Sequence, residues 1–170
     1  SMQSSDYALW QPECRPLLEL SRERSLQYWK KILNSRKSGD TVERRTDFVR
    51  PQLRTFEGGS IERAIGASTV SALSHLAISQ KTSLFIVLFS MWQLLLAKLY
   101  NVSDVTVGTP YAGRDHPAFE RVIGFFVNVL PIYVCTKGIA TVSDIISRTR
   151  DAWTNAVEHA SIPFHEIVDH

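Results

Sequence analysis

The sequence predicts a single α/β domain, and three observations support this prediction. The 170 residues are 44% hydrophobic and 21% charged, an ordinary balance for a globular chain with its own core. Apolar residues at helical spacing alternate along the chain with short runs rich in β-branched residues. Residues 83–100 are apolar on almost every helical face but are too short for a membrane span, which predicts a fully buried core helix.

Charge and cysteine content exclude several functions. Nineteen basic and seventeen acidic residues give a net charge of +2, which is too balanced to indicate a nucleic-acid groove or a strongly acidic partner. Cys14 and Cys135 lie far apart without CxxC spacing, so we expect reduced thiols in a cytoplasmic protein. Ser1 and Met2 are interpreted as a cloning remnant, and the residues that follow show no signal-peptide pattern.

The N-terminal part of the chain predicts a helix, a loop and a short strand. Leucines and Trp29 lie among charged residues over residues 17–33, which predicts a surface helix in two halves. Residues 42–54 are polar and arginine-bearing, so a loop is expected. Ser60 to Ile65 follows two glycines and predicts a short strand.

Two successive helices are predicted next. Residues 67–79 place apolar side chains at helical spacing after a start made of small residues. A polar junction at residues 80–82 then leads into the core helix. An apolar helix of this kind needs packing layers on both sides.

The C-terminal part of the chain alternates strands with helices. Residues 105–107 predict a β-branched strand, and residues 111–121 predict a loop with glycine, proline and charge. Residues 125–134 predict a long buried strand. Capping residues at 141–144 begin a helix with one apolar face, and Pro163 is placed to begin another short helix.

Two motifs have some features of ligand sites but lack the chemistry. Gly108 to Asp115 follows a strand with the glycine spacing of a phosphate loop, but it lacks the lysine and hydroxyl that such a loop needs, and Asp115 would repel phosphate. Three histidines near the C-terminus lie beside acidic residues, yet their spacing does not place ligands on one helix face. These histidines are His159, His165 and His170. We therefore predict no metal site and interpret the cluster as a solvated surface.

Three segments in order resemble the later motifs of condensation domains of nonribosomal peptide synthetases. They are Asp6 to Gln11, Ile123 to Asn128 leading into Leu130-Pro131, and His159 to Val168 with its Ile-Pro-Phe core. Val107 to Arg114 resembles the strand and loop that precede the second segment in this family. The resemblance implies half of a chloramphenicol-acetyltransferase-like fold, a two-layer sandwich with a mixed β-sheet and helices packed on one face.

The resemblance also implies a function and a missing part. The family joins an acyl or peptidyl thioester on one carrier protein to the amine of an aminoacyl group on another. Its catalytic His-His-x-x-x-Asp-Gly motif lies in the N-terminal lobe, and no His-His pair occurs in this sequence. We therefore expect residues 1–170 to be a C-terminal subdomain fragment that ends before the family's final strands, holds no catalytic residue and is inactive alone.

The resemblance assigns roles to nine residues. Asn128, Gly124 and Phe126 are candidates for the substrate tunnel, where the Asn128 amide would bind an acyl carbonyl or the acceptor amine. A structural hydrogen bond is an equally open role for Asn128, because a buried amide needs a partner in either case. Motif or structural roles are expected for Tyr7, Trp10, Gly108, Arg114, Pro163 and Phe164. Tyr133 stands where many members of the family carry arginine, and Val129 stands where many carry threonine. The resemblance therefore implies no charged contact at position 133 and no hydroxyl contact at position 129.

The resemblance implies partners rather than a bound cofactor. Expected partners are the N-terminal lobe of the same domain, donor and acceptor peptidyl carrier proteins with their phosphopantetheine arms, and an adjacent adenylation domain. No cofactor bound directly, no nucleic acid and no membrane are expected. Two alternatives stay open, a non-catalytic module that binds carrier proteins and half of a coenzyme A-dependent acyltransferase. The Gly-Phe-Phe-Val-Asn sequence favours condensation over the epimerisation relatives.

Overall fold

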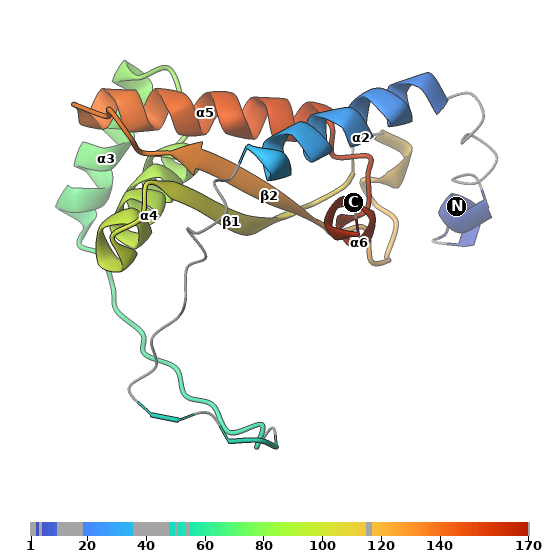
Figure 1. Ribbon diagram of the computed structural model, residues 1–170, viewed down its shortest axis with the longest axis horizontal. Coiled ribbons are helices and arrows are strands. Elements are labelled where there is room, and N and C mark those ends of the chain that lie inside the picture. Colours follow the sequence, from blue (N-terminus) through green and yellow to red (C-terminus); the bar gives the residue numbers. More distant parts are fainter. Residues whose placement is uncertain are drawn as a thin grey trace.

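The α/β fold is confirmed by a computed structural model that describes residues 3, 5–9, 19–35, 48–49, 51–53, 55–114 and 117–169. Within these residues, helices pack against a two-stranded antiparallel sheet (Figure 1). The elements in chain order are α2 (Glu19–Asn34), α3 (Ala67–Ser79), α4 (Leu84–Tyr100), β1 (Asp104–Tyr111), η2 (Pro117–Phe119), β2 (Asn128–Cys135), α5 (Val142–Glu158) and α6 (Phe164–Val168). Ser1, Met2, Cys14, His170 and the first residues of the predicted N-terminal helix lie outside the described residues.

The sheet pairs β1 with β2 over their whole length. The register runs from Asp104 opposite Cys135 to Tyr111 opposite Asn128. Alternate residues point toward the core, so Val105, Leu130 and Ile132 are almost completely buried. The strand β1 is longer than predicted, whereas β2 begins at Asn128 rather than at the predicted Phe125.

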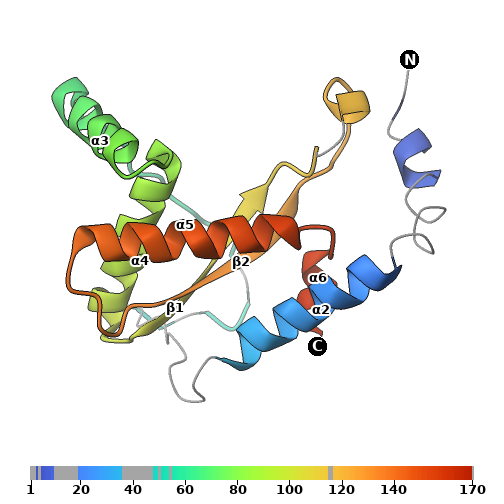
Figure 2. The same cartoon turned by 90° about the horizontal axis from the view of Figure 1, so that it is seen from above.

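The helices α4 and α5 pack next to each other and against the sheet, and Figure 2 shows α5 running along β2. A capping box between Thr141 and Asp144 begins α5, as the sequence predicted. The main core cluster joins β2 to four helices, α2, α4, α5 and α6. It consists of Trp29, Phe89, Leu130, Ile132, Ala156, Ile162 and Ile167. A buried polar contact links the layers, because Gln93 Nε2 donates to the Ile132 carbonyl and Thr149 Oγ1 donates to Gln93 Oε1.

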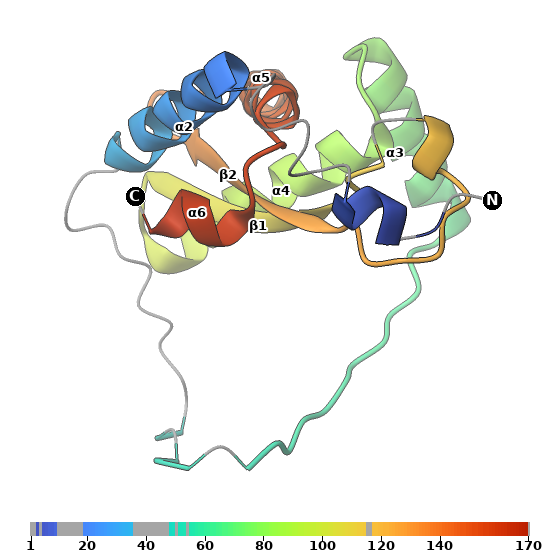
Figure 3. The same cartoon turned by 90° about the vertical axis from the view of Figure 1, so that its right-hand side faces the viewer.

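The helix α2 is one continuous helix and not the predicted two halves. It lies beside the C-terminal end of α5 and the short helix α6 (Figure 3). Trp29 is buried because its indole packs in the core cluster while its Nε1 donates to the His159 carbonyl. Arg22 on α2 also forms an ion pair with Glu166 on α6.

The helix α4 is confirmed, but its complete burial is wrong. Ser83 caps its start and Asn101, in the left-handed conformation, ends it. One face packs in the core, whereas apolar side chains on the opposite face are between 41% and 67% exposed. These side chains are Phe85, Leu88, Trp92, Leu95 and Leu99. The described residues supply a packing layer on one side of α4 only, which is why the outer face is open.

The strand predicted at Ser60 to Ile65 is also wrong. The segment 55–66 is extended without strand pairing and runs away from the helices and sheet (Figure 3). Ile61 and Ile65 are exposed. A strand needs a hydrogen-bonded neighbour, and none of the described residues provides one for this segment.

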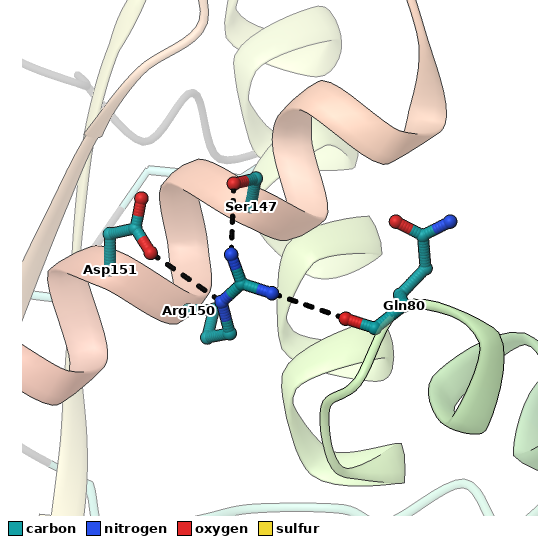
Figure 4. A network of polar contacts seen from close by, with 4 residues as sticks. All are labelled: Gln80, Ser147, Arg150 and Asp151. Carbon is teal, nitrogen blue, oxygen red and sulfur yellow. Dashed lines mark hydrogen bonds and ion pairs between the residues drawn. The ribbon is translucent and has the colours of Figure 1, made fainter.

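The corner between α3 and α4 is held by α5. The two helices meet at 101°. Arg150 on α5 donates from Nη1 to the Gln80 carbonyl at 3.1 Å and from Nη2 to Ser147 Oγ at 3.2 Å, and its Nε contacts Asp151 (Figure 4). No single helix in the described part of the chain has the length and apolar content to span a membrane, although α3 and α4 together, as a bent pair, meet that criterion.

Candidate functional site

The candidate site lies where β2 begins, around Asn128. The side chain of Asn128 makes four hydrogen bonds. Its Nδ2 donates to the carbonyls of Ala160 at 3.0 Å and Ile162 at 2.8 Å. Its Oδ1 accepts from the backbone N–H of Val129 at 2.9 Å and of Phe164 at 3.0 Å. One amide therefore joins the first residue of β2 to the turn 160–164.

These bonds use the whole hydrogen-bonding capacity of the Asn128 amide. A primary amide has two N–H donors and an oxygen with two lone pairs, and each of these four positions has a partner within the chain. The geometry therefore gives Asn128 a positioning task, in which it fixes the turn 160–164 against the sheet. A direct hydrogen bond to substrate stays a prediction, and it would have to replace one of these contacts.

Pro163 and Phe164 lie at the end of this turn. Pro163 is the N-cap of α6 with φ −61°, and Phe164 is its first residue, as the sequence indicated. The backbone N–H of Phe164 is one of the donors that a helix start leaves without an intrahelical partner, and Asn128 accepts from it. The side chain of Phe164 is partly exposed.

Arg114 organises the neighbouring loop, of which the structure describes residues 112–114 and 117–127. Its Nη1 donates to the carbonyls of Phe119 and Val122, and its Nη2 lies 3.4 Å from the carbonyl of Gly124. The guanidinium also lies over the ring of Phe126, 4.4 Å from its centroid. A planar fork of five N–H donors suits this task, since one side chain reaches three carbonyls.

Gly113 is a functional position that our sequence reasoning missed. Its φ is +64°, and a Cβ placed on it would lie 2.1 Å from the carbonyl oxygen of Phe126. Only glycine allows this approach of the two backbone segments. The available signal in the sequence was the Gly-Arg pair formed by Gly113 and Arg114. Gly108 shows a milder case, because a Cβ there would lie 3.2 Å from Val129 Cγ1 across the sheet.

An aromatic cluster completes the inner side of the loop. Tyr7 contacts both Phe119 and Phe126 edge to face, with ring centroids 4.8 Å apart in each pair. Tyr7 therefore brings the first motif segment onto the second. Trp10, predicted to act with Tyr7, lies outside the described residues.

The outer side of the loop is exposed. Ile123 is 95% exposed and Phe125 is 89% exposed, and Gly124 between them is exposed as well. Phe126 points the other way, toward Arg114 and Tyr7. Thus two residues predicted to line the tunnel, Gly124 and Phe126, lie on a loop with a fixed base and an open apolar tip.

Sequence reasoning also missed the role of His159, which it assigned to a solvated cluster. His159 Nδ1 lies 3.0 Å from Ser25 Oγ, and its ring stacks on Tyr28. Burial lowers the pKa of His159, and Arg24 lowers it further while Glu158 opposes the shift. Burial, with the charge of Glu158, raises the pKa of Tyr28 to about 12. Among the described residues, no group of three His, Cys, Asp or Glu side chains gathers as metal ligands.

The three segments that resemble condensation-domain motifs therefore meet in one place. Tyr7 contacts Phe126, Arg114 fixes the loop that carries Phe126, and Asn128 holds the turn 160–164. This arrangement and the α/β fold together indicate one family of domains. The chain belongs to the condensation-domain family, whose model, described as "Condensation domain", matches residues 2–170.

Relatives and solved structures agree with this membership. Malpibaldin synthetase of Mortierella alpina is 33% identical over 169 residues, covering 99% of this chain and 3% of that protein. The crystal structure of SgcC5 protein from Streptomyces globisporus superposes with a TM-score of 0.77 and 25% identity, covering 99% of this chain and 37% of that one. The structure of holo-AB3403, a four-domain nonribosomal peptide synthetase, superposes with a TM-score of 0.76 and 26% identity. The match covers 85% of this chain and 11% of that one. The chain thus spans only a small part of the proteins that it matches.

Proposed function

We propose that this chain is the C-terminal lobe of a condensation domain, spanning residues 1–170, and that it supplies one wall of the substrate tunnel and a surface for carrier proteins. Condensation domains of nonribosomal peptide synthetases form amide bonds. The observation that carries the proposal is the convergence of the three motif segments on Asn128, Arg114 and Tyr7. The first of these segments is more than 100 residues from the other two in sequence, and side-chain contacts join all three at one corner.

The chemical contribution of such a lobe is alignment. A thioester on one carrier and an amine on another react quickly when they are held in the correct geometry, and a misplacement of about 1 Å costs on the order of 100-fold in rate. In this chain Asn128 fixes the turn 160–164 and Arg114 fixes residues 119–126 of the neighbouring loop. The group that accepts the amine proton belongs to the upstream His-His-x-x-x-Asp-Gly motif, so this chain alone is inactive.

The reacting groups reach the lobe on partners. The phosphopantetheine arms of donor and acceptor carrier proteins bring the thioesters, and the chain itself binds no cofactor. The N-terminal lobe and an adenylation domain complete the proposed assembly. The four-domain synthetase among the structural neighbours supports a multidomain context.

The test uses the full-length synthetase with both carriers loaded, in a single-turnover assay of amide formation. Asn128→Ala and Arg114→Ala are compared with Asn155→Ala, an exposed amide on α5. We expect losses on the order of 10- to 100-fold for the first two variants and none for the control. An unchanged rate for both Asn128→Ala and Arg114→Ala would remove the proposed role of this corner.

The non-catalytic alternative is separated by two further observations. The native gene upstream of Gln3 must encode a His-His-x-x-x-Asp-Gly segment in frame if the proposal holds. A wild-type full-length protein that binds loaded carriers but forms no amide would support a carrier-binding module instead. Amide formation with free acyl-coenzyme A in place of the donor carrier would support the acyltransferase alternative.

A further inference from the structure

Three alternate side chains at the start of β2 point into the protein. Phe126 lies against the guanidinium of Arg114, the Asn128 amide bonds the turn 160–164, and Leu130 is buried in the main core cluster. Successive side chains of an extended chain point to opposite sides. The odd-numbered residues of this segment therefore face outward, away from the contacts that hold the corner together.

The outward side of the segment is apolar and open. Phe125 is 89% exposed and Val127 is 43% exposed, and Ile123, two residues earlier in the loop, is 95% exposed. None of these three side chains carries a charge or a hydrogen-bonding group. Large apolar side chains that lie exposed as a group, rather than singly, mark a contact surface. We call Ile123, Phe125 and Val127 the outer face.

The outer face stands on a fixed base. Arg114 donates to the carbonyls of Phe119 and Val122, which precede the outer face in the chain. Gly113 packs so closely on the Phe126 carbonyl that a Cβ there would lie 2.1 Å from its oxygen. Side chains on a fixed backbone distinguish ligands by shape, whereas a mobile loop adapts to any of them. The base therefore suits a surface that selects its ligand.

We propose that Phe125 and Val127, with Ile123 beside them, are specificity-determining residues that contact an apolar side chain of the acyl or aminoacyl group to be condensed. This inference rests on the proposed function, which places this corner at the substrate tunnel. It moves the substrate contact away from Phe126 and Asn128, because their side chains already have partners within the chain.

The chemistry of the outer face selects the class of substrate. An apolar substrate side chain gains free energy when it leaves water against phenylalanine, valine and isoleucine. A charged or amide side chain loses hydration there and finds no hydrogen-bond partner on these three residues. A second lobe seated on the outer face would instead matter equally for every substrate, so the test varies the substrate.

The test measures single-turnover amide formation by the full-length synthetase with both carriers loaded. The rates for a leucyl and an alanyl group are compared, first on the donor carrier and then on the acceptor carrier. In Phe125→Ala we expect the ratio of the leucyl to the alanyl rate to fall by about tenfold in one of these two arms, because apolar contacts discriminate by this order. The arm that responds identifies which of the two groups meets the outer face.

Two results of this assay would overturn the proposal. One is a ratio that Phe125→Ala leaves unchanged in both arms. The other is an equal loss of rate with leucyl and alanyl groups, which would assign the outer face to the other lobe of the domain. Phe125 is mostly exposed, so its replacement removes little core packing and the variant keeps the fold.

Two further variants serve as controls. Phe125→Leu keeps the outer face apolar and should retain most of the wild-type ratio. Ile78 on α3 is 73% exposed and lies at the other end of the molecule from η2 (Figure 2), so Ile78→Ala should leave both rates unchanged. A change of ratio in Ile78→Ala as large as that in Phe125→Ala would contradict an assignment to the outer face.

Photochemical cross-linking tests the contact without turnover. The full-length protein with p-benzoylphenylalanine in place of Phe125 is irradiated with carriers that hold a leucyl group. We expect a cross-link to the leucyl group or its phosphopantetheine arm, and none when the same photoreactive residue replaces Ile78. A cross-link from position 125 only to the other lobe of the same protein would overturn the proposal.

Failure of this inference and failure of the proposed function give different results. If Asn128→Ala and Arg114→Ala lose rate while Phe125→Ala keeps the wild-type ratio, the proposed function stands and this inference falls. If Asn128→Ala and Arg114→Ala keep the wild-type rate, the corner has no role in amide formation and both fall.

Discussion

Replacing Asn128 with alanine should destabilise the chain through one corner of the structure. The change removes four hydrogen bonds and leaves two N–H groups and two carbonyls to find other partners. Each such bond contributes about 0.5–1.5 kcal/mol net, so four sum to roughly 2–6 kcal/mol. Water reaches part of this half-buried site, which places our expectation near 3 kcal/mol.

Urea and thermal denaturation of the 170-residue chain measure this loss. For a domain of this size, about 3 kcal/mol lowers the Tm by roughly 6–12 °C. The control Asn155→Ala removes an exposed amide from α5 and should change the free energy of unfolding by no more than about 0.5 kcal/mol. A loss below about 1 kcal/mol for Asn128→Ala would refute the reasoning, because the four bonds would then have been replaced by water at little cost.

Three further predictions concern other parts of the chain. Gly113→Ala forces a Cβ to 2.1 Å from a backbone oxygen and should lower the free energy of unfolding, measured in urea, by more than about 2 kcal/mol. The control Gly138→Ala, also at positive φ but with open space around it, should lower it by only about 1 kcal/mol. Equal losses in the two variants would be inconsistent with the clash. Because the pKa of Tyr28 is raised to about 12 in the folded state, the folded chain binds more protons than the unfolded one above about pH 10, so stability should fall as the pH rises through that window, and less steeply in Tyr28→Phe. Thr149→Val leaves the oxygen of Gln93 buried without its donor and should lower the free energy of unfolding by about 1–3 kcal/mol; no change in chemical denaturation would count against that contact.

Several elements followed from the sequence because their causes are local. The capping box at Thr141 and Asp144 acts within one helical turn, so it is readable from neighbouring residues. The helix over residues 67–79 was predicted with the bounds that the structure shows. Motif order in the chain was also sufficient to indicate the family.

Other features depend on residues that are distant in sequence. Three of the four partners of Asn128 lie more than 30 residues away, and the partners of His159 on α2 lie 130 residues away or more. No local pattern therefore distinguished a structural amide from a substrate ligand, or a partly buried histidine from a solvated one. The open face of α4 and the unpaired segment 55–66 were mispredicted for a related reason. Periodicity reports that a face is apolar, but only the packed structure shows which neighbours cover it.

The sequence by itself thus determined the main helices, the two paired strands, their order and the family to which the chain belongs. The tertiary structure alone decided that Asn128 and Arg114 hold backbone segments and that His159 connects α2 to the same corner. The physical reason is that helix caps and hydrophobic periodicity are short-range, whereas a side chain's hydrogen-bond partners and burial depend on which distant segments pack against it.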